Sequence, residues 1–249
     1  MKLMLAATLC FKYEVELESA LESFYYAMNK GESVEEYIKL KGQDNFILDS
    51  GAFSMMGGNA GKLDKKILKE YVDKYCDYVV KYNIKNFIEL DIDSIIGYTE
   101  VKKINRYIEE KVGRKPMYVH HLQTRTIDDL NNACKESDYI CWGGIAKARK
   151  NIKDIDNFCS YIRGLGTRAH MLGYSPPFLE NCKHLYSCDS TSWSSGVRGV
   201  SMYSFNNNKL TYEAIKNKKR ISDFGIQQHN LEQWVKYQKF LKTKGWITT

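Results

Sequence analysis

Proline is scarce in this sequence, and no stretch of it is rich in proline, glycine and serine together. Only three prolines occur among 249 residues, and the chain contains neither an internal repeat nor a low-complexity tract. These absences leave no candidate linker between domains. At this length the chain suits one domain better than two, because single α/β domains run to roughly 200–250 residues.

The cysteines give no sign of a disulfide framework, since they are scattered, odd in number and include no Cys-x-x-Cys motif. They are Cys10, Cys76, Cys134, Cys141, Cys159, Cys182 and Cys188. Free thiols are typical of a reducing compartment, so the sequence predicts a cytoplasmic protein. His184 lies between two of these cysteines, but the spacing fits no standard structural zinc site, and we predict no metal there.

Long hydrophobic runs are also missing. The first ten residues are apolar enough to resemble a leader peptide, but Lys12, Glu14 and Glu16 follow at once, without a convincing cleavage site. A buried first strand explains the same residues. No other apolar run approaches the about 20 residues that a membrane-spanning helix needs, so we predict no membrane association.

The composition suits a folded domain with a modest positive charge. Hydrophobic residues make up 43% of the chain and aromatic residues 13%, which is enough for a sizeable core and more than disordered chains contain. The formal net charge of +7 favours acidic partners such as nucleic acid. A lysine-rich surface that serves solubility explains the same charge.

Eight apolar runs of strand length recur along the chain, each followed by a turn and a polar amphipathic stretch. Runs that are almost continuously apolar are typical of parallel strands, which are buried on both faces. The runs are Lys2–Thr8, Asn45–Asp49, Asn86–Asp91, Pro116–His121, Tyr139–Gly144, Arg168–Gly173, Leu185–Asp189 and Gly199–Phe205.

The stretches between these runs are predicted to be helices, because apolar residues recur in them at steps of three and four. Asp64 is expected to cap one helix at its start, and Gly113 stands where another should stop. The clearest predicted helices are Leu63–Tyr82, Thr99–Val112, Asp154–Leu165 and Asn230–Lys244.

The alternation of strands and helices predicts an α/β fold with a parallel sheet, and eight strands predict closure into a single (β/α)8 TIM-type barrel over residues 1–249. Residues 205–249 are expected to form a helical C-terminal extension, after a turn at 206–208. An open doubly wound sheet is the alternative. Against it, Thr8-Leu9-Cys10-Phe11 follows the first strand, where such folds carry a glycine-rich phosphate-binding sequence.

Acids end three of the predicted strands, at Asp49, Asp91 and Asp189. Active sites of TIM-type barrels lie at the carboxyl ends of the strands. Acids on three strands are difficult to explain as solvated loop residues, so we predict that they converge on one functional rim. Asp93 points the same way as Asp91 if the strand continues, but it could equally cap the next helix.

Histidines end two further strands, at His120-His121 and at His170. Because successive side chains of a strand alternate between its faces, only one of the two consecutive histidines can point into the barrel. A buried, hydrogen-bonded structural histidine is as good an explanation here as a functional one.

Five short motifs resemble those of the tRNA-guanine transglycosylases. The similarity is best to the shorter branch of that family, found in phages and related elements, that places 7-deazaguanine bases in DNA. Together the motifs span about three-fifths of the chain. In chain order they are Asp49-Ser50-Gly51-Ala52-Phe53-Ser54, Phe87-Ile88-Glu89-Leu90-Asp91, Gly143-Gly144-Ile145-Ala146, Met171-Leu172-Gly173-Tyr174, and Tyr186-Ser187-Cys188-Asp189-Ser190 followed by Arg198.

The resemblance implies an enzyme that exchanges guanine in DNA for a free 7-deazaguanine base such as preQ0, with no metal and no nucleotide cofactor. It implies that Asp189 is the nucleophile, forming a covalent aspartyl–sugar intermediate, and that Asp49 is the general acid or base. Asp91 would read the guanine edge. The base-binding residues that it implies are Ser50, Gly51, Phe53, Asp91, His121, Gln123, Gly143, Gly144 and Gly173.

Basic residues near the predicted rim are expected to contact phosphates, although ordinary surface solvation explains them as well. The main candidates are Lys147, Arg149 and Arg198, with Arg125 and Lys150 beside them.

The sequence also departs from the family pattern. Ala52 and Ser54 replace a glycine and a glutamine, and the family's Cys-x-Cys-x-x-Cys zinc motif is absent. The missing zinc site favours DNA over tRNA as the partner. For DNA, the target nucleotide must leave the base stack or already be single-stranded.

Two other function classes remain open on the sequence alone. One is a metal-dependent barrel hydrolase that uses His120 or His121, His170 and an aspartate, although no His-x-His pair follows the first strand to support it. The other is a barrel that binds nucleic acid without catalysis.

Overall fold

Seven parallel strands form one curved sheet in the computed structural model, which describes residues 1–9, 15–29, 31–55, 64–144, 151–175, 179–194, 201–214 and 224–244. Their order across the sheet is β3-β2-β1-β7-β6-β5-β4. The strands are β1 (Lys2–Ala6), β2 (Ala20–Ser23), β3 (Phe46–Asp49), β4 (Val119–His121), β5 (Tyr139–Gly143), β6 (Arg168–Met171) and β7 (Ser187–Ser190).

Residues 86–89 join the two edges of this sheet. Phe87 pairs with Leu48 of β3, and Ile88 pairs with Met117 just before β4, both as parallel bridges. The Ile88 N–H donates to the Leu48 carbonyl at 2.9 Å, and the Met117 N–H donates to the Phe87 carbonyl at 2.7 Å. The ring therefore closes through an eighth parallel segment, and the predicted TIM-type barrel is confirmed.

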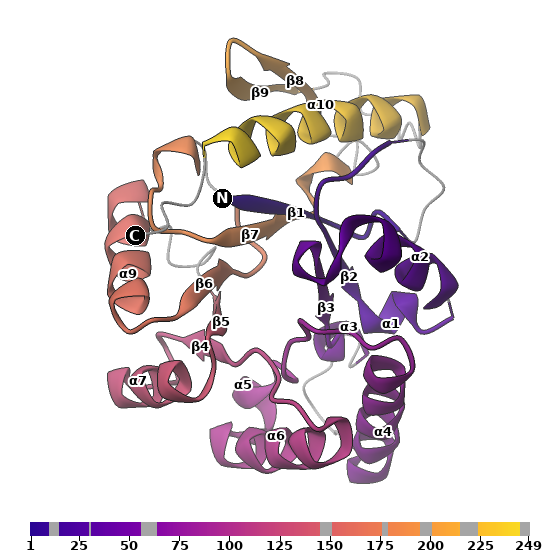
Figure 1. The fold of residues 1–249 in the computed structure, drawn as a ribbon, viewed down its shortest axis with the longest axis vertical. Helices are drawn as coiled ribbons and strands as arrows, with labels where there is room; N and C mark the ends of the chain where they lie inside the picture. Colours follow the sequence, from indigo (N-terminus) through magenta and orange to yellow (C-terminus); the bar gives the residue numbers. More distant parts are fainter. Residues whose placement is uncertain are drawn as a thin grey trace.

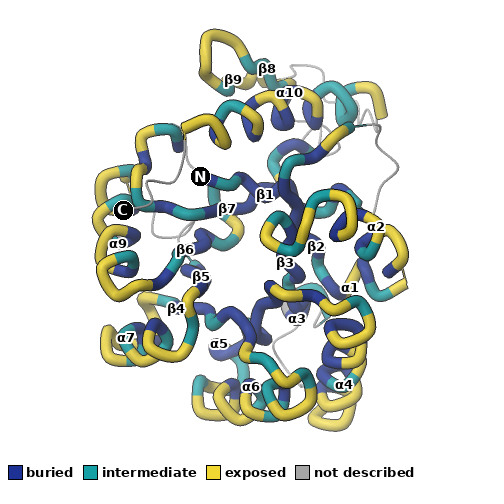
Figure 2. Tube along the Cα trace, in the orientation of Figure 1, coloured by how far each residue is buried: buried dark blue, intermediate teal, exposed yellow. Residues whose placement is uncertain are grey.

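Helices surround the ring, and most of the exposed residues lie on their outer faces (Figures 1 and 2). They are α1 (Phe24–Ala27), α2 (Gly31–Lys41), α3 (Ala52–Met55), α4 (Lys65–Lys81), α5 (Asp93–Ile96), α6 (Tyr98–Val112), α7 (Ile127–Glu136), α9 (Ile152–Gly164) and α10 (Phe224–Thr243), with short 3-10 turns η1 (Gln43–Asn45) and η2 (Leu179–Asn181).

The four predicted helices are confirmed as α4, α6, α9 and α10; the first three differ by at most two residues at each end, whereas α10 begins six residues earlier than predicted. Asp64 caps α4 as expected, since its carboxylate accepts from the Lys66 N–H at 2.7 Å. Gly113 ends α6 in the left-handed conformation, with φ of 72°, which glycine adopts without strain. No helix in the described part of the chain is long and apolar enough to cross a membrane.

The core consists of two layers because the side chains of each strand alternate between two faces. One face lines the barrel interior, and the other packs under the helices. On β1, for example, Met4 and Ala6 belong to the interior cluster, whereas Leu3 and Leu5 pack in the outer layer. The interior cluster consists of Met4, Ala6, Leu21, Ile47, Ile88, Met117, Val119, Tyr139 and Cys141.

The sequence predicts the right number of barrel strands but one wrong member. Strand β2 is missed because its sequence, Ala-Leu-Glu-Ser, has one large apolar residue and a buried acid, Glu22. The Leu9 N–H donates to the Glu22 carboxylate at 2.6 Å, which helps to explain how a polar strand is buried here.

The predicted eighth strand, Gly199–Phe205, is not part of the barrel. Its described residues belong to β8 (Ser201–Asn206), which pairs antiparallel with β9 (Lys209–Ala214) in a hairpin beside α10 (Figure 1). The predicted turn is confirmed, since Asn207 and Asn208 both have positive φ, as two-residue hairpin turns require. The prediction that the tail is helical is wrong for β9. An apolar run alone does not distinguish a barrel strand from one that packs on a helix.

Tyr75 of α4 supports the closure of the ring at residues 86–89. Its side chain is fully buried, and its hydroxyl donates to the Ile88 carbonyl at 2.7 Å and lies 3.4 Å from the Leu48 carbonyl. We expect Tyr75→Phe to lower the free energy of unfolding by about 1–3 kcal/mol, because it leaves a buried carbonyl without its donor. Urea denaturation would measure the loss. The control Tyr212→Phe, on an exposed tyrosine of β9, should change stability by less than about 0.5 kcal/mol. Equal effects of the two changes would contradict this role for Tyr75.

Candidate active site

The alternation of strand side chains brings the predicted site residues to one end of the barrel. Asp49 follows the interior residue Ile47 at a distance of two, and His121 follows Val119 in the same way. Both therefore share the interior face at the carboxyl ends of their strands. The register places Asp189 of β7 beside Met4, another interior residue.

Asp49 lies in an unusual electrostatic environment. Burial, together with the negative charges of Asp189 and Asp91, raises the pKa of its carboxyl to about 7, against the opposing effect of the Gly51 and Ser50 backbone N–H groups. The Gly51 N–H lies 3.3 Å from Asp49 Oδ2. Because these charges act on Asp49, the three carboxylates at the predicted strand ends lie near one another.

Two hydrogen-bonding groups hold the Asp189 carboxylate. Its Oδ1 accepts from the Gly173 N–H at 2.6 Å and lies 3.2 Å from His170 Nε2. Gly173 has φ of 65°, which lets its N–H turn toward the carboxylate. Gly173, predicted to bind substrate, donates this N–H to Asp189.

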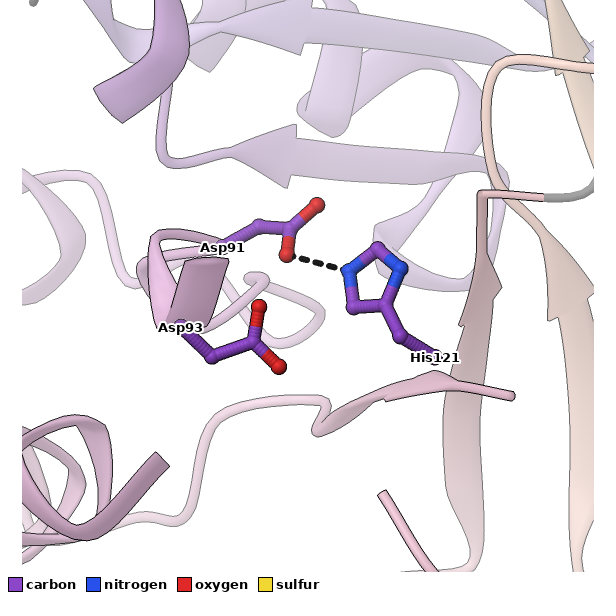
Figure 3. A group of neighbouring side chains, drawn as sticks. All are labelled: Asp91, Asp93 and His121. Atoms are coloured by element: carbon purple, nitrogen blue, oxygen red, sulfur yellow. Dashed lines mark hydrogen bonds and ion pairs between the residues drawn. The ribbon is translucent and has the colours of Figure 1, made fainter. Parts of the chain in front are cut away.

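Asp91 forms a pair with His121, whose Nε2 lies 2.5 Å from Asp91 Oδ1 (Figure 3). Burial disfavours a charged His121, but the hydrogen bond to Asp91 and the charges of Asp91 and Asp93 outweigh it and raise the histidine pKa. Asp93 lies beside this pair, and one potential ligand atom from each of the three residues lies within 4.8 Å of the others.

Glycines at the rim make room for these side chains. A Cβ on Gly143 would lie 2.4 Å from the His121 ring, so only glycine leaves space for it. Gly144, with φ of 72°, lies beside the exposed side chain of Gln123. Gly51, with φ of 65°, approaches Ser23 and the Tyr25 backbone. Their first role is therefore packing.

Ser50 is buried, and its carbonyl accepts from the Tyr71 hydroxyl at 2.6 Å. This contact fixes the loop after Asp49. The side chain of Phe53 and the basic residues Lys147, Arg149, Lys150 and Arg198 lie outside the described residues.

Two residues considered at the sequence level point elsewhere. His120 faces outward and stacks on Phe158 of α9, and burial lowers its pKa to about 4. Arg125, expected at the phosphate-binding rim, is buried in ion pairs with Glu89 at 2.8 Å and Asp93 at 3.1 Å. The expectation for Arg125 is wrong, because its charge is already neutralised inside the protein.

The polar groups packed against Asp189 are not apparent from the sequence. His170 is considered only as a metal ligand, but both of its nitrogens have partners, Asp189 on one side and Ser187 on the other. Ser187 also bonds to the Tyr139 hydroxyl. The interior alternation of β5, β6 and β7 could have placed these residues in one stack, had the strand registers been known.

No protein-family model matches the sequence, and a search of curated proteins finds no relative. Among solved structures the chain is similar to a GH10 endoxylanase retrieved from a sugarcane soil metagenome, with a TM-score of 0.43 and 13% identity over 70% of this chain and 68% of the other. It is also similar to a mandelate racemase/muconate lactonizing enzyme-like protein from Rubrobacter xylanophilus, with a TM-score of 0.43 and 10% identity over 86% of this chain and 59% of the other. Similarity at this level does not bear on function.

The raised pKa of Asp49 makes stability depend on pH. Its folded value of about 7 exceeds the ordinary value of about 3.9, so the folded protein holds this proton more tightly than the unfolded chain. The stability that this proton supplies is complete below about pH 4 and is lost as the pH rises through about 7. Asp49→Asn cannot ionise and avoids the loss.

We therefore expect the free energy of unfolding of Asp49→Asn, relative to that of wild type, to be on the order of 1–2 kcal/mol higher at pH 8 than at pH 5. This is below the full value of about 1.36 kcal/mol per pKa unit, because the side chain is partly exposed. Asp77→Asn, on the exposed face of α4, is the control and should show no such gain. A pH-independent difference for Asp49→Asn would contradict the assigned pKa.

Proposed function

We propose that the protein is a guanine transglycosylase that replaces guanine in DNA by a 7-deazaguanine base through a covalent aspartyl–sugar intermediate. One observation carries the proposal: Asp49, with its pKa raised to about 7, lies close enough to Asp189 and Asp91 to respond to both charges. Two carboxyl groups in different environments can divide the tasks of acid and nucleophile. The motif resemblance assigns the same two roles to the same two residues.

In the first half-reaction, an oxygen of the Asp189 carboxylate forms a bond to the sugar C1′ as the bond from C1′ to guanine N9 breaks. The protonated Asp49 donates its proton to the departing guanine, so that guanine leaves as a neutral base. A carboxyl with a pKa near neutrality is suited to this step, because it still holds a proton at working pH and releases it readily.

In the second half-reaction, the incoming 7-deazaguanine loses its N9 proton to the Asp49 carboxylate. Its N9 then bonds to C1′ and displaces Asp189, which restores both residues to their starting state. The cycle balances without a metal, a redox partner or a nucleotide cofactor, as the resemblance implies.

Asp91 is placed to read the base in this proposal. A carboxylate can accept from both guanine N1–H and the 2-amino group, and a base without these donors leaves the carboxylate unpaired and is rejected. His121 holds Asp91 in the free protein. Ser50, Gly51, Gly143, Gly144 and Gln123 are the proposed base-binding residues, together with Phe53.

DNA is the proposed partner on two grounds: the net charge of +7 and the absence of the zinc motif of the tRNA enzymes. The exchanged nucleotide has to be extruded to reach carboxylates at the barrel mouth. Lys147, Arg149 and Arg198 stay the proposed phosphate contacts.

Trapping the intermediate tests the proposal. Guanine-containing single-stranded DNA incubated with the protein should yield a denaturation-resistant protein–DNA adduct. Asp189→Ala should remove the adduct and lower base exchange by at least about 10⁴-fold, because no other group replaces the nucleophile. Asp77→Ala, an exposed acid on α4, should keep both. DNA binding that survives loss of both Asp49 and Asp189, with no turnover by the wild type, would instead favour a binding protein without catalysis.

A metal-dependent hydrolase is a second candidate, favoured by the cluster of Asp91, Asp93 and His121. Against it, Asp93 Oδ2 already accepts from Thr124 Oγ1 at 2.8 Å and Arg125 Nε at 3.1 Å. A guanidinium this close repels a cation. We expect elemental analysis of the purified protein, also after equilibration with Zn²⁺ or Mn²⁺ and desalting, to find much less than one ion per chain. One tightly bound ion, lost in Asp91→Asn, would favour the hydrolase.

A further inference from the structure

A buried row of polar groups extends from the barrel interior to Asp189. His170 has no exposed surface; its Nε2 lies 3.2 Å from Asp189 Oδ1 and its Nδ1 lies 2.7 Å from Ser187 Oγ. The Ser187 hydroxyl in turn bonds to the hydroxyl of Tyr139. Four side chains on three neighbouring strands, β5, β6 and β7, thus form one hydrogen-bonded series.

The Asp189 carboxylate sets the direction of this series, because it can only accept and therefore calls for a proton on His170 Nε2. Burial raises the pKa of Tyr139 well above its ordinary value, so the phenol keeps a proton that it can donate to Ser187 Oγ. Ser187 has a single proton, and the acceptor left for it is His170 Nδ1. A neutral His170 then carries its proton on Nε2, which donates to the Asp189 carboxylate.

The same series selects one oxygen of Asp189. Within the described residues, the hydrogen bonds to this carboxylate all go to Oδ1, from the Gly173 N–H and from His170. Two donors hold Oδ1 and withdraw charge from it, whereas Oδ2 keeps its lone pairs for a reacting atom. The carboxylate can neither rotate nor exchange its oxygens without breaking both bonds.

We infer that His170, kept neutral with its proton on Nε2 by Ser187 and Tyr139, is the positioning residue that fixes Asp189 so that Oδ2 attacks the sugar. The inference rests on the proposed function for the identity of the attacked atom. The tautomer and the restraint on Asp189 are properties of the free protein. His170 therefore acts through the nucleophile and touches neither the base nor the sugar.

The first test needs no substrate. Nitrogen-15 NMR of the histidine rings distinguishes the two neutral tautomers from the doubly protonated ring. We expect His170 to show a protonated Nε2 and a bare Nδ1 at neutral pH, and Ser187→Ala to introduce the other tautomer, because Nδ1 loses its donor. A doubly protonated ring, a proton on Nδ1 in the wild type, or no change in Ser187→Ala would overturn the inference.

The second test compares two substitutions of His170. Glutamine keeps an N–H donor near the position of Nε2, whereas leucine does not. We expect His170→Leu to slow adduct formation about 100-fold, at the upper end of effects seen when a group that orients a functional ligand is removed, with KM for DNA within about twofold of wild type. His170→Gln should recover at least about tenfold of this loss.

His184→Gln supplies the matched control. His184 Nδ1 pairs with Asp156 at 3.0 Å outside the site. This variant therefore removes a histidine–aspartate pair without touching Asp189. The rate of adduct formation should stay unchanged. Ser187→Ala keeps the assay informative if His170→Leu fails to fold, and it should slow the adduct about tenfold.

The outcomes distinguish a failure of the proposed function from a failure of the positioning role of His170. If the wild type forms no adduct on any guanine-containing DNA, the proposed function fails, while the NMR result still decides the tautomer. If the wild type forms the adduct and His170→Leu forms it at the same rate, or if glutamine restores nothing that leucine removes, the positioning role is wrong.

Discussion

The gathering of three carboxylates, one buried and two partly buried, at one end of a closed ring of strands is the constraint on which this site depends. Charges of one sign repel, and burial removes the water that would screen them. The protein meets this constraint differently at each acid. Asp91 is paired with His121, Asp189 is held by the Gly173 N–H and His170, and Asp49, which forms no ion pair with any residue that the structure describes, has its pKa raised to about 7. Three chemically identical groups thus become a base reader, a nucleophile and a proton carrier in the proposed reaction.

The barrel was predictable because its strands carry a strong signal. Buried parallel strands are apolar almost throughout, and the helices between them have regular stripes, so most elements were found close to their true positions. The errors have physical causes. Strand β2 is short and contains the buried Glu22, whose partner is the Leu9 N–H, and no periodicity reveals such a partner. Strand β8 is apolar on one side because it packs on α10, where its N–H groups at Tyr203 and Phe205 donate to Asn230 and Gln233.

The sequence predicts the site residues that stand at strand ends, but not the residues that support them. Asp49, Asp91 and Asp189 were identified because each ends an apolar run, and the structure brings them together. The contacts of the buried residues behind these acids could not be predicted. The stack of His170, Ser187 and Tyr139 depends on the register of three strands, and the burial of Arg125 depends on Glu89 and Asp93 facing it. For Gly143, the sequence suggests a ligand contact, whereas the structure shows a packing role. A glycine that suggests an open backbone for a ligand is needed first to accommodate the ring of His121.

The central claim is that these carboxylates exchange a base, and the products of the reaction test it most directly. Guanine-containing DNA is incubated with the protein and free preQ0 or a related 7-deazaguanine, then digested and analysed by nucleoside mass spectrometry, with guanine-containing tRNA treated in parallel. The account predicts a new 7-deazaguanine deoxynucleoside in the DNA, matched mole for mole by released guanine, and little change in the tRNA. Unchanged nucleosides in the DNA with every 7-deazaguanine base offered would contradict it.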